Sequence, residues 1–202
     1  MVEKKILQRV GKPVGKAEIP PRERILEAAR ELFYAKGIRA VSVDEIAAAA
    51  QTNKMTLYRH FASKDELVSE YLRTAAREAD CCWARLEQAH PGDALAQLRT
   101  FIRDMADHAT GTRGCPLVNA AVELPDKDHP ARRVIEEHKI AWRARLVALC
   151  QAAGLAEPEL LADELNLMLE GARVSSQSVG PGGLRARLER ISEALIASHS
   201  QA

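Results

Sequence analysis

The sequence has few aromatic residues: Phe, Trp and Tyr make up 4% of its 202 residues, although 47% of the residues are hydrophobic. No segment shows sustained alternation of apolar and polar residues, and strand-forming residues are sparse, which argues against a fold built on β-strands. No apolar run approaches the ~20 residues needed to cross a bilayer, and the N-terminus lacks the apolar centre of a secretory signal. We therefore expect an all-α protein located in the cytoplasm.

The chain also has no residue spacing that is typical of a disulfide framework or of a metal site. Its four cysteines include no C-x-x-C pair, and the adjacent Cys81 and Cys82 would point to different sides of a helix. Phosphate loops and nucleophile elbows are missing too, so we expect no cofactor, no metal and no enzymatic activity. Two alternatives remain open: a thiol or metal sensor built from Cys115 and His108, and a small helical enzyme that uses Cys115, His108 and Glu123.

Charge of one sign does not dominate, because the net charge is only +1. Residues 1–70 hold 13 Lys and Arg against 10 Asp and Glu, or +3, and the remainder holds 16 against 18, or −2. Residues 1–20 form a basic leader with Pro and Gly interruptions, which predicts a flexible segment. This leader either stays in solvent or lies along nucleic-acid phosphates as a basic arm.

The most informative segment runs from Ser42 to Phe61, SVDEIAAAAQTNKMTLYRHF. Ser42 begins a capping box with Glu45 for a first short helix, and Asn53 is a good N-cap for a second helix that starts at Lys54. Only two bulky apolar residues of the second helix, Leu57 and Phe61, share a face. The other side chains are therefore free to donate hydrogen bonds, as in a helix that enters the major groove of DNA.

The flanking residues extend this pattern to a three-helix unit. A preceding helix has Ile25, Ala29 and Phe33 on one face and ends at Gly37. A second capping box at Ser63 begins a long helix directly after the helix that starts at Lys54, which we refer to as the reading helix. A surface helical hairpin is the alternative interpretation, but it does not explain why the three helices lead directly into a longer one.

Together these residues resemble the DNA-binding domain of the TetR family of transcriptional regulators, over residues 22–72. The matching positions are Ile25, Leu26, Ala28, Ala29, Leu32, Phe33, Gly37, Val43, Ile46, Ala47, Thr56, Leu57, Tyr58, His60, Phe61, Ser63, Lys64 and Leu67. The chain departs from the family at Gln51, where Gly is usual, so we expect Gln51 to adopt a left-handed or strained conformation.

The resemblance implies a role for each matched position. Ser42, Tyr58, His60 and Lys64 correspond to phosphate contacts, whereas Lys54, Met55 and Thr56 correspond to positions that face base edges. Arg59 could serve either purpose. Domain boundaries follow: a DNA-binding domain at 21–67, with its motif at about 42–61, and a larger helical effector-binding and dimerisation domain at 68–202.

In the larger domain we expect six further helical segments, counting the one that begins at Lys64. They start near Lys64, Asp93, Pro116, Asp128, Glu157 and Leu184, with a flexible connection over 175–183. Aromatic and polar residues scattered among core positions could together line a mainly apolar pocket for a small molecule. These residues are Trp83, Phe101, Met105, His108, Asn119, Glu123, His138 and Trp142.

The last two helices look too apolar for the surface of a monomer. One interpretation is half of a four-helix bundle across a two-fold axis, and the other is burial of both faces inside one chain. The family resemblance favours the first, because its members dimerise through their last two helices. The predicted interface residues are Leu165, Leu169, Ala172, Leu184, Leu188, Ile191 and Leu195.

These inferences combine into one functional hypothesis. We expect a homodimeric repressor that binds double-stranded DNA at a palindromic operator and is released by a small-molecule effector. A transcriptional activator or a ligand-independent regulator of the same fold is the alternative. Neither a membrane nor a cofactor is an expected partner.

Overall fold

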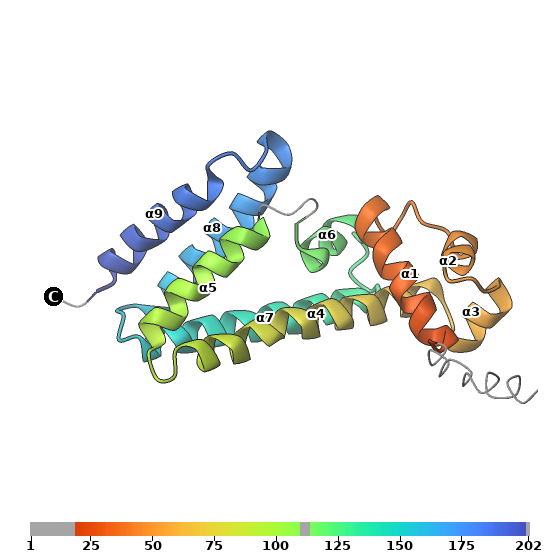
Figure 1. Cartoon of the computed structure of the whole chain (residues 1–202), viewed down its shortest axis with the longest axis horizontal. Helices are drawn as coiled ribbons and strands as arrows, with labels where there is room; N and C mark the ends of the chain where they lie inside the picture. The colour runs from red at the N-terminus through yellow and green to blue at the C-terminus, as the bar shows by residue number, and fades with distance from the viewer. Residues whose placement is uncertain (1–18, 110–113, 201–202) are drawn as a thin grey trace, which may run out of the picture.

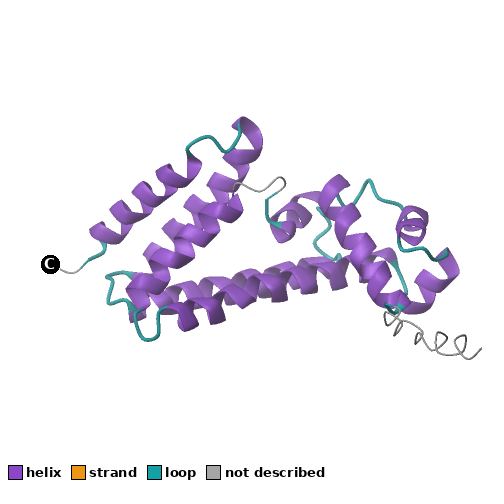
Figure 2. Cartoon of the chain, in the orientation of Figure 1, coloured by secondary structure: helices purple, strands orange, loops and turns teal. Residues whose placement is uncertain are grey.

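The computed structural model describes residues 19–109 and 114–200, and these residues form nine helices and no named strand (Figures 1 and 2). The leader at 1–18 lies outside the described residues. In chain order the helices are α1 (Pro21–Lys36), α2 (Val43–Ala49), α3 (Lys54–His60), α4 (Lys64–Ala89), α5 (Ala94–Ala109), α6 (Pro116–Glu123), α7 (Pro130–Ala152), α8 (Pro158–Val179) and α9 (Leu184–Ser198). The all-α prediction is confirmed.

Local sequence signals account for most helix starts. Side chains of Ser42, Asn53 and Ser63 accept a hydrogen bond from the backbone N–H three residues later and so cap α2, α3 and α4. Proline occupies the first turn of α1, α6, α7 and α8, where its missing N–H costs nothing. The predicted connection at 175–183 is too long, because α8 continues to Val179 and ends before Gly180.

Helices α1, α2 and α3 lie together at one end of the molecule, and α5, α8 and α9 lie at the other (Figure 1). Helices α4 and α7 connect the two ends and pack against each other. At 26 residues, α4 is about 39 Å long. Within the described residues, no helix is both long and apolar enough to cross a membrane.

Two large hydrophobic clusters share α4. The first joins α1, α2 and α3 to Leu67 and Leu72 of α4, and it includes Leu117 of α6 and Val134 of α7. The second contains Leu86 of α4 together with apolar residues of α5, α7, α8 and α9. The predicted boundary between residues 67 and 68 therefore cuts through a continuous core, and the N-terminal helices pack on α6 and α7 as well as on α4.

Candidate functional site

The turn between α2 and α3 holds the second helix of the motif at a fixed angle. Gln51 has φ of 51°, which confirms the left-handed conformation expected where this chain lacks glycine. The backbone N–H of Thr52 donates to the Ala47 carbonyl at 2.9 Å, and Asn53 then caps α3 through the N–H of Thr56 at 2.9 Å. The turn is thus closed by backbone and side-chain hydrogen bonds before the reading helix begins.

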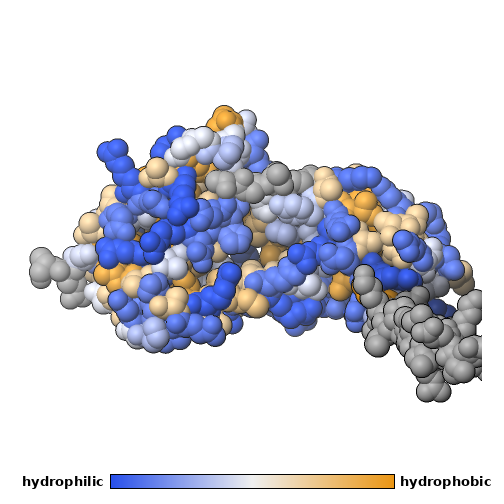
Figure 3. Space-filling model, in the orientation of Figure 1, coloured by the Kyte–Doolittle hydropathy of each residue, from blue (hydrophilic) through white to orange (hydrophobic). Residues whose placement is uncertain are grey.

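Helix α3 separates its side chains as the sequence predicts. Leu57 and Phe61 point into the core and are 0% and 1% exposed. Met55, in contrast, is 80% exposed and Tyr58 is 42% exposed. The remaining predicted contacts on this helix are Lys54 and Arg59, which are exposed, and Thr56 and His60, which are half-buried. Figure 3 shows small apolar areas among hydrophilic residues at this end of the molecule.

Two ion pairs connect the reading helix and its partner to the rest of the unit. Lys54 Nζ lies 3.2 Å from Asp44 Oδ2, so a side chain that is predicted to read bases forms an ion pair with a carboxylate of α2. Glu45 pairs with Lys36 of α1, which lowers the pKa of the Glu45 carboxyl group. Here the structure corrects the predicted capping box: Ser42 Oγ does accept from the Glu45 N–H at 3.1 Å, but the Glu45 carboxylate turns to Lys36.

Lys64 faces inward, which differs from its predicted role as a phosphate contact. Its Nζ donates to the Ile38 carbonyl at 2.7 Å and lies 5.9 Å from the centre of the Phe33 ring. Burial lowers the pKa of Lys64, and nearby Asp65 and Glu123 oppose this shift. In this conformation Lys64 holds the turn between α1 and α2, whereas Ser42 remains exposed at the surface.

Four of the predicted effector residues meet in an aromatic cluster, formed by Trp83 of α4, Phe101 of α5, and His138 and Trp142 of α7. The Trp83 ring is stacked on Phe101 with centroids 5.1 Å apart, and it meets Trp142 edge-on at 5.0 Å. The His138 ring lies 5.6 Å from that of Trp142. Met105 is buried in the same core, where its sulfur accepts a hydrogen bond from Arg173 at 3.4 Å.

The polar groups of this cluster differ in whether they have a hydrogen-bonding or charged partner. The indole Nε1 of Trp83 is buried and has no hydrogen-bond partner among the described residues. His138 Nδ1 lies 3.9 Å from Asp80 Oδ1, which also accepts from Arg145 at 2.9 Å. Burial lowers the pKa of His138 more than Asp80 raises it, and the charges of Lys139 and Arg145 add to the lowering, which favours the neutral imidazole. The cluster therefore combines aromatic rings with an N–H donor that no described residue uses, and an ion pair lies beside His138.

The other predicted effector residues lie elsewhere. Glu123 Oε2 accepts from the backbone N–H groups of Ile38 at 2.6 Å and Arg39 at 3.3 Å, so it joins α6 to the turn after α1. His108 is exposed on α5, with Nδ1 2.6 Å from the Asp104 carbonyl oxygen, and Asn119 is half-buried on α6.

These positions also bear on the enzyme alternative. Cys115 and Glu123 lie at opposite ends of α6, about 12 Å apart along its axis. They therefore do not form a catalytic constellation with each other in this structure.

Most of the predicted dimer residues are buried inside the single chain. Leu165, Leu169, Ala172, Leu184 and Leu188 are between 0% and 6% exposed, because α8 and α9 pack against α5, α7 and each other. These five residues are therefore not at the surface, where a partner chain could contact them, so this part of the interface prediction is wrong. The alternative, burial inside one chain, accounts for them. Leu195 is half-buried, and only Ile191, 48% exposed, lies at the surface.

A different set of apolar residues is exposed on α8, and the sequence analysis missed it. Leu160, Leu167 and Val174 recur every seven residues and are 47%, 68% and 59% exposed. We refer to these three residues as the outer stripe. Helix α8 is thus apolar on two opposite faces, one buried in the chain and one open. The seven-residue spacing was the available signal.

Comparison with known proteins agrees with this geometry in both halves of the chain. Residues 25–71 match the model for bacterial regulatory proteins of the tetR family. Residues 94–195 match the model for the tetracyclin repressor-like C-terminal domain.

Relatives match the chain over most of its length. The chain is 30% identical to the HTH-type transcriptional repressor Rv3405c of Mycobacterium tuberculosis over 79% of its own length and 89% of the relative. It is 28% identical to the repressor ComR of Escherichia coli, covering 84% and 86% of the two chains. The crystal structure of SCO4454, a TetR-family regulator from Streptomyces coelicolor, superposes with a TM-score of 0.84 and 30% identity over 90% of this chain and 96% of that one. The chain is therefore a DNA-binding transcriptional regulator that belongs to the TetR family.

Proposed function

We propose that the protein is a homodimeric repressor that reads a palindromic operator with α3 and is released by a small-molecule effector. The observation that carries the proposal is the exposure of Met55 and Tyr58 on a helix whose neighbours Lys54 and Arg59 are cationic. A short helix that presents hydrogen-bond donors and an apolar side chain together suits the major groove, where both kinds of contact are made to base edges. The major groove supplies thymine methyl groups for Met55 and acceptor atoms for Lys54.

The division of contacts follows from the position of each side chain. Lys54, Met55 and Thr56 begin α3 and are proposed to reach base edges, while Tyr58 and His60, with Ser42 at the start of α2, contact phosphates. Arg59 is exposed and can serve either purpose. Because the target is chromosomal DNA, we place the protein in the cytoplasm and assign it no catalytic role.

The length of α3 supports a dimer. Its seven residues span about 10 Å, which corresponds to about three base pairs at ~3.4 Å each. Such a short site is too common in a genome to define an operator. Two copies of α3 spaced by about one helical turn, ~34 Å, would read a palindrome of useful length.

We place the dimer contact on the outer stripe of α8, with the exposed Ile191 of α9 as a further candidate. Gly171 lies between Leu167 and Val174 on this face, and a β-carbon built on it has no neighbour within 4 Å among the described residues. A glycine in the middle of a helix costs about 1 kcal/mol relative to alanine. No described residue lies close enough to require a glycine there, whereas close approach of a second α8 would require a small residue.

The aromatic cluster is the proposed effector site. An apolar ligand with one acceptor atom would gain from the buried Trp83 N–H, which has no partner among the described residues. Trp83 lies on α4, and the same helix packs against α1 through Leu67 and Leu72. Two tilts of α4 would place the two α3 helices at different spacings. A ligand that binds one tilt better than the other would shift the equilibrium between these two conformations by the difference in its affinity for them.

Selection of genomic DNA fragments by the purified protein tests the proposal. We expect enrichment of a palindrome that is released as the salt concentration rises. Tyr58→Ala should weaken binding to all sequences, whereas Lys54→Ala should also relax the base preference. Lys127→Ala is the control for Lys54→Ala: it also removes one positive charge, but from the loop after α6, and should leave binding unchanged. Weak binding with no enriched sequence would contradict the assignment of α3.

The dimer contact needs its own measurement, by sedimentation equilibrium. Leu167→Glu places a charge in the middle of the outer stripe and is expected to yield monomers with unchanged helix content. Val122→Glu is the matched control, because Val122 is also a strongly exposed apolar residue but lies on α6. A Leu167→Glu protein that remains dimeric would remove the outer stripe as the interface.

A further inference from the structure

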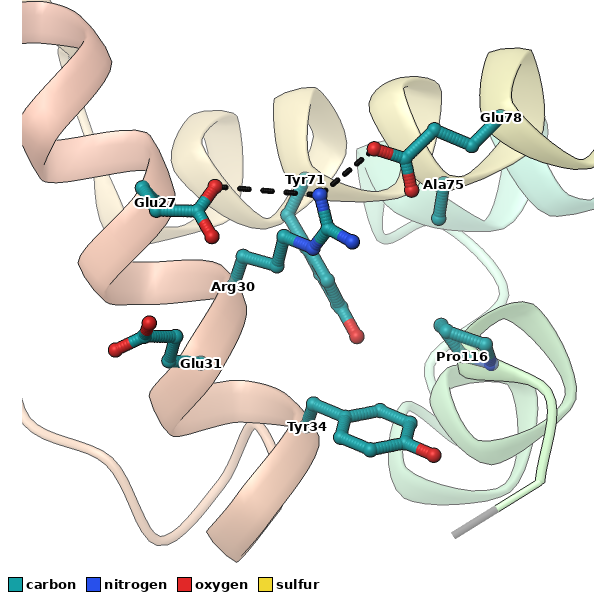
Figure 4. A pocket seen from close by; sticks show the side chains of 8 residues that line it. All are labelled: Glu27, Arg30, Glu31, Tyr34, Tyr71, Ala75, Glu78 and Pro116. Atoms are coloured by element: carbon teal, nitrogen blue, oxygen red, sulfur yellow. Dashed lines mark hydrogen bonds and ion pairs between the residues drawn. The ribbon is translucent and has the colours of Figure 1, made fainter. Parts of the chain in front are cut away.

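A hollow of about 320 Å³ lies between α1, α4 and α6 (Figure 4). Its sides are the rings of Tyr34 of α1 and Tyr71 of α4, with Ala75 of α4 and Pro116 of α6 completing the apolar part. Its volume is at the lower end of the range of small-molecule pockets. We refer to it as the junction groove.

Carboxylates dominate the rim of the junction groove. Of the residues that the structure describes, Glu27 and Glu31 of α1 and Glu78 of α4 line it, with Arg30 as the one cation. A second hollow of about 180 Å³ shares Glu27, Arg30 and Tyr71 with the first and adds the carboxylate of Glu23. The described residues therefore give the groove an excess of negative charge over an aromatic and apolar lining.

The ion pairs of Arg30 indicate which kind of ligand the junction groove can bind. Its guanidinium lies 2.7 Å from Glu78 Oε1 and 4.0 Å from Glu27 Oε2, so one cation from α1 sits between two carboxylates from different helices (Figure 4). All three side chains are about half exposed or more, which keeps these pairs weak and exchangeable. A ligand cation could take the place of the Arg30 guanidinium while its apolar body lies against the tyrosine rings.

We propose that the junction groove binds a small aromatic cation of the amidinium or guanidinium class, held between Glu27 and Glu78 and against Tyr34 and Tyr71. Such a ligand would contact α1, α4 and α6 at once. It would not need the aromatic cluster, and the site is independent of the effector role proposed for that cluster.

Titration of the ¹⁵N-labelled full chain with benzamidinium tests the proposal, with the neutral benzamide as the matched ligand. We expect saturable amide shifts at residues 27–34 and 71–78 with benzamidinium only. Each of Glu27→Gln and Glu78→Gln should weaken binding about three- to fivefold, as for the loss of one exposed charge pair. Arg30→Gln should tighten binding, because it removes the internal competitor.

Two remote variants control for overall charge. Glu159→Gln, in the first turn of α8, and Arg99→Gln, which is paired with Glu193 on α9, make the same charge changes at the other end of the molecule. Both should bind benzamidinium as the parent chain does, and circular dichroism should show all variants folded. The proposal is overturned if benzamide binds equally well, if the shifts map to α5 and α7, if Arg30→Gln does not tighten binding, or if Glu159→Gln weakens it as much as Glu78→Gln.

Discussion

Replacing Glu123 by alanine removes the carboxylate that joins α6 to the turn between α1 and α2. Its bond to the Ile38 N–H is 2.6 Å long, and Ile38 is only 5% exposed. A hydrogen bond to a charged group contributes about 1.5–3 kcal/mol, and a buried donor left without an acceptor loses most of that. The bond to the exposed Arg39 N–H is 3.3 Å long, and water can replace it. We therefore expect Glu123→Ala to lower the free energy of unfolding by about 2 kcal/mol.

Urea unfolding followed by circular dichroism measures this cost. For a chain of this length the same change should lower the melting temperature by roughly 4–8 °C. Glu123→Gln keeps an acceptor oxygen but loses the charge, so it should cost about 1 kcal/mol. Glu136→Ala, at an exposed position of α7, is the control. A Glu123→Ala protein within about 0.5 kcal/mol of the parent chain, the usual effect of a neutral surface change, would refute the reasoning.

The neighbouring Gly37 gives an independent check of the same contact. Gly37 has φ of 90°, and a β-carbon added there would lie 2.8 Å from Glu123 Oε2. Gly37→Ala should therefore be destabilising by about 1–3 kcal/mol through backbone strain alone. Its cost should be smaller in a Glu123→Ala background, because the steric part is then relieved. Strictly additive costs would show that the two residues do not interact.

Two further predictions concern the reading helix and the aromatic cluster. Asp44→Asn frees Lys54 and removes a negative charge beside the DNA phosphates, so gel-shift assays should show tighter binding, most of all to non-specific DNA, and unchanged affinity would contradict the assigned face. Burial lowers the pKa of His138 below its ordinary 6.5, so as the pH falls through 6.5 the unfolded chain takes up a proton that the folded chain does not. Stability should therefore fall over this window, and His138→Gln should flatten the slope; equal slopes for both proteins would exclude His138 as its source.

The helix-turn-helix was predictable because its determinants are local. Capping by Ser42 and Asn53 and the buried pair Leu57 and Phe61 each follow from residues three or four positions apart. The left-handed Gln51 was expected from the family resemblance, because Gly is usual at that position. The helix starts marked by proline have local determinants as well. The carboxylate of Glu45 departs from this rule, because its partner Lys36 lies on another helix.

Contacts between distant parts of the chain were not predictable in this way. Glu123 is 85 positions from Ile38, and its role at the turn left no periodic signal in either segment. Helix α8 shows a different limit. Leu165 and Leu167 are chemically identical, yet one is 0% and the other 68% exposed, because α7 and α9 cover only one face of the helix. Apolar content predicted that α8 packs against other helices but not which of its leucines are buried and which are exposed.

The chain has two tryptophans, and both belong to the aromatic cluster. Indole emission from the intact protein therefore originates at one place, between α4, α5 and α7. The tyrosines Tyr34, Tyr58 and Tyr71 lie in or beside the DNA-binding end. A solution of the unlabelled protein thus contains a spectroscopic reporter of the proposed effector site, against a background free of tryptophan emission from the helix-turn-helix and the junction groove.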